Sequence, residues 1–275
     1  MGLRLRARQT IGEIAYRVRP HTLPSGSLSV LMYHAVTREN LRDPEQQSVS
    51  LQQFSDQMET LQGMGVRWVS LEEGLRLLKK GHGFGTLVSV VFDDGYVGVH
   101  DLALEVLVRY RIPATLFLAT EQIGRSAFPD SSPRLGRPLT WSEVQFLIRE
   151  TGCAIGSHGH SHRVLTWLSS EKIREELKTS RATIENRVNQ ACRLFAYPYG
   201  AAGTFDARTE GLLSEGGFTI VCTALWGRCR AEVHPLRLPR MRVSWCDTPH
   251  ELEKSLAGCY DWYRLLQLLQ PHRTL

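Results

Sequence analysis

The sequence of 275 residues has no closely spaced pair of cysteines. Its six cysteines are scattered from Cys153 to Cys259, and none belongs to a Cys-x-x-Cys motif. This spacing is typical of reduced thiols and differs from both a disulfide framework and a cysteine-held zinc site. We therefore expect a reducing compartment and a metal site, if there is one, built from other residues.

Long apolar segments are also missing. No run approaches the roughly 20 apolar residues that a membrane span needs. The first residues lack the uninterrupted apolar core of a signal peptide. These features favour a cytoplasmic location.

Positive charge is concentrated at one end of the chain. The formal net charge is +5, and residues 1–24 hold five arginines against one glutamate, a net +4. Nucleic-acid readers usually carry a basic stripe on the folded domain, so nucleic acid is not an expected partner. Within residues 1–19, apolar side chains recur at helical spacing, and most arginines lie off that stripe. This helix is predicted either to rest peripherally on the inner, anionic membrane face or to dock on its own domain.

The rest of the chain alternates between strand and helix patterns. Predicted strands cover residues 28–33, 68–69, 86–92, 114–118, 153–157, 194–197 and 219–223. Predicted helices cover residues 51–65, 71–80, 102–110, 140–150, 170–190, 207–215 and 251–270. The alternation predicts an α/β fold with a parallel sheet in one domain, residues 27–275, preceded by the basic amphipathic segment 1–26.

Polar clusters follow the predicted strands, where the chemistry of parallel α/β folds collects. Asp93 and Asp94 come directly after the strand 86–92, and two adjacent carboxylates there need partners, one of them a cation. His158 and His162 are four residues apart, so on a helical turn both imidazoles would face one ion. Two histidines and one carboxylate leave positions open for water and substrate, which indicates a catalytic metal site.

These residues resemble the motifs of the polysaccharide deacetylases of carbohydrate esterase family 4, the NodB homology domain, over roughly residues 28–242. Phe92-Asp93-Asp94-Gly95 matches the first motif, which implies that Asp93 is the base and Asp94 a metal ligand. The segment from His158 to His162 matches the second motif, with Gly159 in place of a hydroxyl residue, and implies two further ligands. The resemblance implies a distorted, incomplete (β/α) barrel that binds one divalent metal ion, Zn²⁺ foremost, with Co²⁺, Ni²⁺ or Mn²⁺ tolerated.

The third motif is only partly kept. Residues 197–200 retain the Pro-Tyr-Gly turn, but Ala196 stands where the family has the arginine that pairs with the base. This looks like the branch of exopolysaccharide and poly-N-acetylglucosamine deacetylases, in which the backbone N–H of Tyr199 would stabilise an oxyanion. Arg240 or Arg242 is expected to supply the missing charge, with Arg242 as the chosen catalytic candidate.

The family's C-terminal motif, which carries the general acid, is absent because the predicted helix 251–270 contains no histidine. In the branch that this chain resembles, the acid comes from the first strand, and His34 in Met32-Tyr33-His34-Ala35 matches that position. Without this resemblance, a histidine on an apolar strand is more often a core residue. The candidate substrate-binding residues are Tyr96, Pro198, Tyr199 and Gly200.

The resulting hypothesis is a metal-dependent hydrolase that removes an N-acetyl or other N-acyl group from an amino sugar. Its partner would be a polysaccharide or a lipid- or nucleotide-linked precursor, and a cytoplasmic location favours the precursor. One alternative is an inactive family member that binds a glycan or a protein partner, for which Ala196 is the best evidence. Another is a deformylase or amidase that acts on a different C–N bond.

Overall fold

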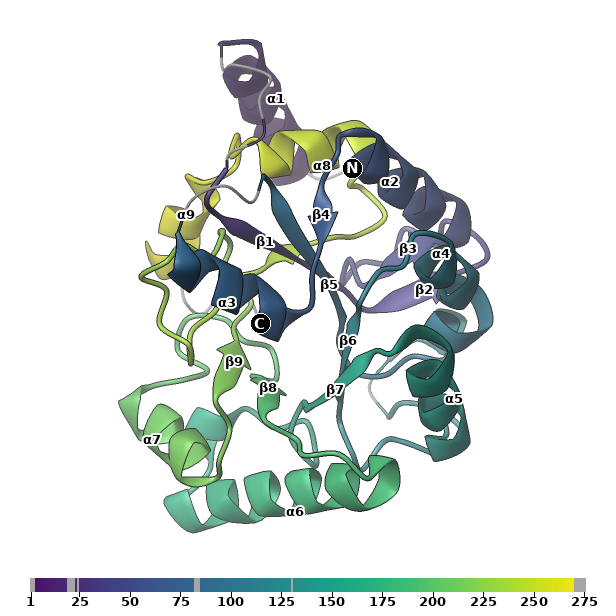
Figure 1. Ribbon diagram of the computed structural model, residues 1–275, viewed down its shortest axis with the longest axis vertical. Coiled ribbons are helices and arrows are strands. Elements are labelled where there is room, and N and C mark those ends of the chain that lie inside the picture. Colours follow the sequence, from purple (N-terminus) through teal and green to yellow (C-terminus); the bar gives the residue numbers. More distant parts are fainter. Residues whose placement is uncertain (1–2, 19–22, 24, 82–84, 130, 270–275) are drawn as a thin grey trace.

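A computed structural model describes residues 3–18, 23, 25–81, 85–129 and 131–269, and Figure 1 shows its curved parallel sheet with helices packed around it. The main strands are β1 (Leu28–Tyr33), β4 (Arg67–Trp68), β5 (Leu87–Phe92), β6 (Thr115–Leu118), β7 (Ala154–Ser157), β8 (Leu194–Ala196), β9 (Ile220–Cys222) and β10 (Met241–Arg242). Their order is β10-β1-β5-β6-β7-β8-β9, with β4 also paired to β5. All these pairings are parallel, which confirms the predicted incomplete barrel.

Helices follow most of the strands. They are α1 (Leu3–Val18), α2 (Leu51–Gly63), α3 (Leu71–Lys80), α4 (Leu104–Arg109), α5 (Trp141–Thr151), α6 (Ser170–Val188), α7 (Ala207–Glu215), α8 (Pro249–Leu256) and α9 (Tyr263–Leu269). The short elements are a separate parallel pair, β2 (Ala35–Thr37) and β3 (Ser48–Ser50), a π-helical turn η1 (Val99–Ala103), and two 3-10 turns, η2 (Pro133–Leu135) and η3 (Leu165–Trp167).

Local signals fix several of these boundaries. The Ser70 hydroxyl accepts a hydrogen bond from the backbone N–H of Glu73 at 3.2 Å and so begins α3, as its sequence position predicts. Thr140 and Glu143 form a capping box at the start of α5. The single predicted helix 251–270 is wrong, because the chain breaks between α8 and α9 at Gly258, whose φ is +80°.

The sheet order explains where the polar residues meet. Strand β5 lies between β1 and β6 and is buried along its whole length. Since the strands are parallel, their carboxyl ends lie at the same edge of the barrel. The residues that follow β1, β5, β7 and β8 therefore converge there, and they include His34, Asp93, His158 and Tyr199.

The N-terminal helix α1 docks on the domain. Arg8 donates to Asp247 at 2.9 Å, and Gly12 lies so close to Tyr260 that a Cβ there would be 2.2 Å from the ring. The outward side chains of Ile11, Ile14 and Val18 are 44%, 61% and 79% exposed. Among the described residues, no helix has the length and apolar character to span a membrane. The side chains of residues 3–6 lie outside the description, and membrane contact stays a prediction.

A close backbone contact between β2 and η1 gives the first testable prediction. A Cβ at Gly98 would lie 1.9 Å from the carbonyl oxygen of Val36, so Gly98→Ala is expected to lower the free energy of unfolding by about 2 kcal/mol or more. Gly211→Ala is the matched control: no atom lies within 4 Å of that Cβ, and at this exposed position of α7 alanine should raise the free energy of unfolding by roughly 0.5–1 kcal/mol. Urea unfolding checks both variants, and equal stability would contradict the close approach.

Candidate active site

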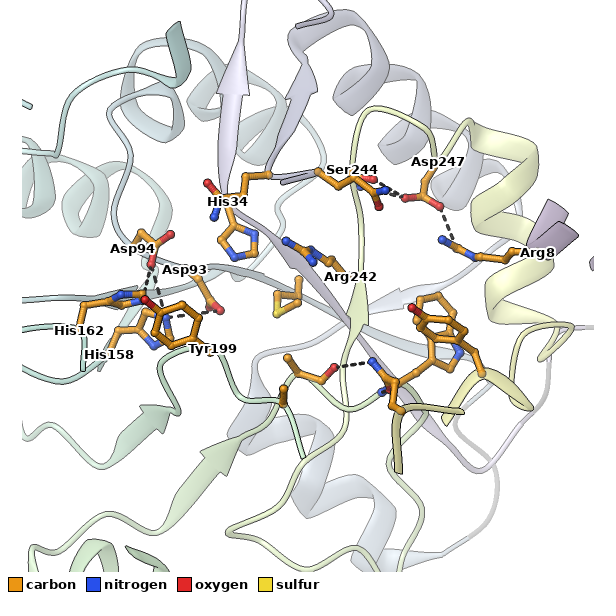
Figure 2. Close-up of a pocket in the computed structure, with 18 residues that line it drawn as sticks. Arg8, His34, Asp93, Asp94, His158, His162, Tyr199, Arg242, Ser244 and Asp247 are labelled. Carbon is orange, nitrogen blue, oxygen red and sulfur yellow. Dashed lines mark hydrogen bonds and ion pairs between the residues drawn. The ribbon is translucent and has the colours of Figure 1, made fainter. Parts of the chain in front are cut away.

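One cavity opens at the carboxyl edge of the sheet and brings together residues from across the chain. Its wall includes Asp93 and Asp94 after β5, the histidines of the segment after β7, Tyr199 after β8, and His34 after β1. Figure 2 shows Asp94 pointing toward the two histidines, while Asp93 and His34 point into the space between them and Arg242. The predicted convergence of these strand ends is therefore observed.

The turn after β5 separates the two adjacent carboxylates. The Asp93 backbone N–H donates to the carbonyl oxygen of Tyr33 at 2.9 Å, which continues the strand pairing, and Asp94 then takes a left-handed φ of +68°. This conformation is uncommon for a residue with a Cβ. It allows Asp94 to turn toward the histidines while Asp93 faces the interior.

The two histidines lie on an extended loop, so the predicted helical turn is wrong. The loop reverses at Gly159, with φ of +78°, and His162 has φ of +59°. Glu176 of α6 fixes the loop, because its carboxylate accepts hydrogen bonds from the backbone N–H groups of His160 and Ser161, both at 2.9 Å. Contacts with a distant helix therefore bring the imidazoles together, and the four-residue spacing alone does not.

The ligand atoms are placed as one metal ion requires. Asp94 Oδ1 lies 3.4 Å from Nε2 of His158 and 3.2 Å from Nε2 of His162. Two ligands of a tetrahedral Zn²⁺ with bonds near 2.0 Å are themselves about 3.3 Å apart. His158 Nδ1 donates to the carbonyl oxygen of Ala196 at 2.7 Å, which leaves Nε2 for the metal. These three residues fit a single divalent ion.

The protonation states suit metal binding. Burial opposes the charged form of Asp94, but the hydrogen bond with His162 and the nearby imidazoles hold the pKa of this carboxyl well below its ordinary value. Burial lowers the pKa of His158 to about 4, against the opposing charge of Asp93. Near neutral pH, an ionised carboxylate and a neutral imidazole are the forms that coordinate a metal.

Arg240, and not Arg242, is the partner of Asp93, which corrects the choice made from the sequence. The Arg240 guanidinium is 2.7 Å from Asp93 Oδ1, and its Nε donates to the carbonyl oxygen of Thr223 at 2.7 Å. Arg242 lies two residues nearer the rim, roughly 6–7 Å along the strand, and donates to the carbonyl oxygen of Glu45 at 2.6 Å. Burial opposes ionisation of Asp93, but the Arg240 charge keeps its pKa below the ordinary value.

The predicted substrate contacts are only partly placed at the cavity. Tyr96 is 2% exposed, and its ring packs on Phe128. Its hydroxyl forms a hydrogen bond with the Ser131 hydroxyl at 2.8 Å. The predicted role of Tyr96 as an accessible sugar contact is therefore corrected. Pro198 and Gly200 are buried and shape the turn. Tyr199 is 51% exposed and lines the cavity.

His34 lines the cavity with an imidazole ring. Its Nδ1 is buried, and no hydrogen-bond partner for it is found among the described residues. Burial lowers the pKa of His34, while the charges of Asp94 and Asp93 oppose that shift. The side chain thus stands at the predicted strand end and faces the site rather than the core.

The cavity also reaches residues that the sequence did not suggest. Arg8, Trp226, Asp247 and Gln267 line its far side, although they come from α1, the segment after β9, the segment after β10 and α9. No motif or spacing connects these positions. Only the folded chain brings them to one surface.

Comparisons with known proteins find related sequences and structures. The family model described as polysaccharide deacetylase matches residues 81–221, a range that includes the three proposed metal ligands and Asp93. His34 and Arg240 lie outside that range. The chain is 28% identical over 209 residues to a poly-beta-1,6-N-acetyl-D-glucosamine N-deacetylase of Staphylococcus epidermidis, covering 72% of this chain and 68% of that protein.

Two solved structures share the fold. IcaB from Ammonifex degensii superposes with a TM-score of 0.71 at 24% identity, covering 86% of this chain and 99% of that one. The Streptococcus pyogenes deacetylase PplD, solved in complex with acetate, gives a TM-score of 0.71 at 22% identity, covering 84% of this chain and 98% of that one. Both likenesses support the barrel architecture.

The ligand geometry predicts which substitutions remove the metal. Asp94→Asn and His158→Ala are each expected to weaken Zn²⁺ binding by roughly 100-fold or more, because each removes one of three ligands. Equilibrium dialysis followed by metal analysis gives the affinity. The parent should bind one ion per chain.

Two controls accompany this measurement. His100→Ala changes a second His and carboxylate group, formed with Asp101 and Glu143 and more exposed than the site, and should leave the affinity unchanged. Asp93→Asn should also retain the ion, since Asp93 is assigned no ligand position. Equal metal content in the parent and both ligand variants would place the metal elsewhere.

Proposed function

This chain belongs to the polysaccharide deacetylase family, and we propose that it hydrolyses the N-acetyl group of an amino sugar with the help of one divalent metal ion. The observation that carries the proposal is the position of Asp94, His158 and His162 around one point beside the ion-paired Asp93. The name of the Staphylococcus epidermidis relative supports N-acetylglucosamine as the sugar. A polymer and a lipid- or nucleotide-linked precursor are both within this substrate class.

Asp94, His158 and His162 would hold the metal. Zn²⁺ is the proposed ion because two imidazoles and one carboxylate suit it, and Co²⁺, Ni²⁺ or Mn²⁺ fit the same ligand set. When bound, such an ion polarises the acyl carbonyl and lowers the pKa of a bound water. Asp94 and His158 are buried, and the neighbouring imidazoles keep Asp94 ionised by lowering its pKa.

Asp93 is the proposed base, and its two oxygens have different surroundings. Oδ1 is occupied by Arg240 at 2.7 Å, whereas Oδ2 faces His158 Nε2 at 3.9 Å. Oδ2 is therefore the atom available to take a proton from water beside the ligands. Arg240 keeps Asp93 ionised and fixes its orientation from inside the barrel.

Tyr199 and His34 serve the two remaining needs of amide hydrolysis. The backbone N–H of Tyr199, at a residue with φ of +63°, has no acceptor within the described part of the chain, and we assign it to the developing oxyanion. The amine is a poor leaving group unless it is protonated, and His34 is the proposed acid because its imidazole borders the cavity.

The alternatives predict different outcomes. The absence of an arginine at position 196 is the best evidence for an inactive binding protein. Arg240, however, supplies the positive charge beside Asp93 that an arginine at position 196 would give. Ala196 therefore does not support that alternative. A deformylase or another amidase would use the same residues on a different amide. A panel of N-formyl, N-acetyl and cyclic amide substrates distinguishes these activities.

Acetate release from short N-acetylglucosamine oligomers tests the proposal. Asp93→Asn is expected to lower kcat by about 10²- to 10⁴-fold with the metal retained, because the base is lost. His34→Gln should lower kcat by about 10²-fold and change KM little, since the acid acts on the leaving amine. His100→Gln is the matched control and should keep the parent's kinetics. Bound metal with no acetate release from any amide would contradict the proposal.

We also propose that α1 contacts an anionic membrane surface at the cytoplasmic face. The exposed side chains of Ile11, Ile14 and Val18, together with the local positive charge, support this proposal. Ile14→Asp is expected to weaken sedimentation with phosphatidylglycerol vesicles by about tenfold, because an exposed apolar side chain that would insert into the membrane surface is replaced by a negative charge. Val108→Asp on α4, also exposed, is the control, and equal loss in both variants would contradict a role for α1.

A further inference from the structure

The cavity has a second end, away from the proposed metal ligands. In Figure 2, Arg242 lies between His34 and Ser244, and Arg8 lies beyond Asp247, on the opposite side of the view from His162. We call this part the basic end, and it is lined by Arg8, Trp226, Arg242, Ser244, Asp247, Tyr263 and Gln267. All seven residues lie outside the range 81–221 that the family model matches. The basic end is therefore a feature of this chain's own flanking segments.

The carboxylates that line the cavity already have partners. These pairs are Asp93 with Arg240 at 2.7 Å, Asp247 with Arg8 at 2.9 Å, and Asp94 with His162 at 3.2 Å. Arg242 differs, because it donates to the carbonyl oxygen of Glu45 and no carboxylate in the described ranges lies within ion-pairing distance of it. Within the described residues, the guanidinium of Arg242 therefore has no ion-paired carboxylate, although Asp43, Asp247 and Asp93 lie near enough to favour its charged form.

Two further donors at the basic end have no acceptor. Nε of Arg8 and Nε1 of Trp226 are both buried, and within the described residues neither has a hydrogen-bond partner. Arg8 is held rigidly, since it pairs with Asp247 and stacks over the ring of Tyr260 at 4.7 Å. Buried donors are normally satisfied in folded proteins, so the two N–H groups leave unused hydrogen-bonding capacity in the side chains around the basic end.

We infer that the basic end binds a phosphate group of the substrate, so that the amino sugar enters as a phosphate ester. A guanidinium without an ion-paired carboxylate binds phosphate through paired, charge-assisted hydrogen bonds, and Arg8 and Trp226 line the same end of the cavity. A neutral polysaccharide offers acceptors but no charge for Arg242. The inference rests on the proposed function, because the acetamido group must reach Asp93 while the phosphate lies at Arg242.

The test compares two substrates that differ at the anomeric oxygen, which carries a phosphate in one and an uncharged methyl group in the other. The metal-loaded parent is expected to have a kcat/KM for N-acetylglucosamine 1-phosphate about tenfold or more above that for methyl N-acetylglucosaminide. Arg242→Gln should bring this ratio close to one. Arg174→Gln, an exposed arginine on α6, is the matched control and should keep the parent's ratio. A general structural defect would lower both rates and leave the ratio unchanged.

A binding measurement separates this inference from the proposed function. Glucose 1-phosphate carries the phosphate but no amide, and calorimetry should show that it binds the metal-loaded parent about tenfold more tightly than it binds Arg242→Gln. If no amide is cleaved, the proposed function fails, and the difference in glucose 1-phosphate affinity between the parent and Arg242→Gln still tests phosphate binding at the basic end. If both sugars are cleaved equally, or Arg242→Gln keeps the parent's preference, the inference is overturned. A nucleotide-linked and a polyprenyl-phosphate-linked N-acetylglucosamine then show which carrier of the phosphate is used.

Discussion

Asp93 stands at the end of a fully buried strand, 2% exposed, where an isolated carboxylate would be protonated or would destabilise the fold. Its ion pair with Arg240 satisfies that constraint, and Arg240 itself is 1% exposed and held by the carbonyl oxygen of Thr223. Removing one member of such a pair typically costs about 3–5 kcal/mol, because the other charge stays buried. The same contact joins the end of β5 to the segment before β10, so the packing inside the incomplete barrel and the ionised state of Asp93 depend on each other.

This pairing changes the meaning of Ala196. The usual family motif has an arginine at this position. In this chain Ala196 contributes only its backbone carbonyl oxygen, which accepts a hydrogen bond from His158 Nδ1 at 2.7 Å and so orients that imidazole. The positive charge comes instead from Arg240, directly before β10, and it pairs with the carboxylate of Asp93. A barrel allows this exchange because side chains from several strands meet inside it. A missing motif residue is thus weak evidence for lost activity until the interior neighbours of the base are known.

Local patterns predicted most strands and helices to within one or two residues, and the site residues that follow β5, β7 and β8 were found from their place at strand ends. The errors involve contacts between distant segments. The loop that holds His162 is shaped by Glu176, which no local spacing reveals. Choosing Arg240 over Arg242 requires the depth of each residue in the barrel, and the basic end joins Arg8 to Asp247, which are 239 residues apart.

Three residues of the site, Asp94, His162 and Tyr199, share an uncommon left-handed backbone, with φ between +59° and +68°. Each such residue costs of order 1 kcal/mol or more unless its surroundings hold it. Glu176 holds the histidine loop, and the hydrogen bond from Ala224 N–H to the Gly200 carbonyl, at 2.8 Å, holds the turn after Tyr199. Because the backbone sets the direction of two proposed ligands and of the Tyr199 N–H, residues outside the proposed site determine whether that site is preorganised.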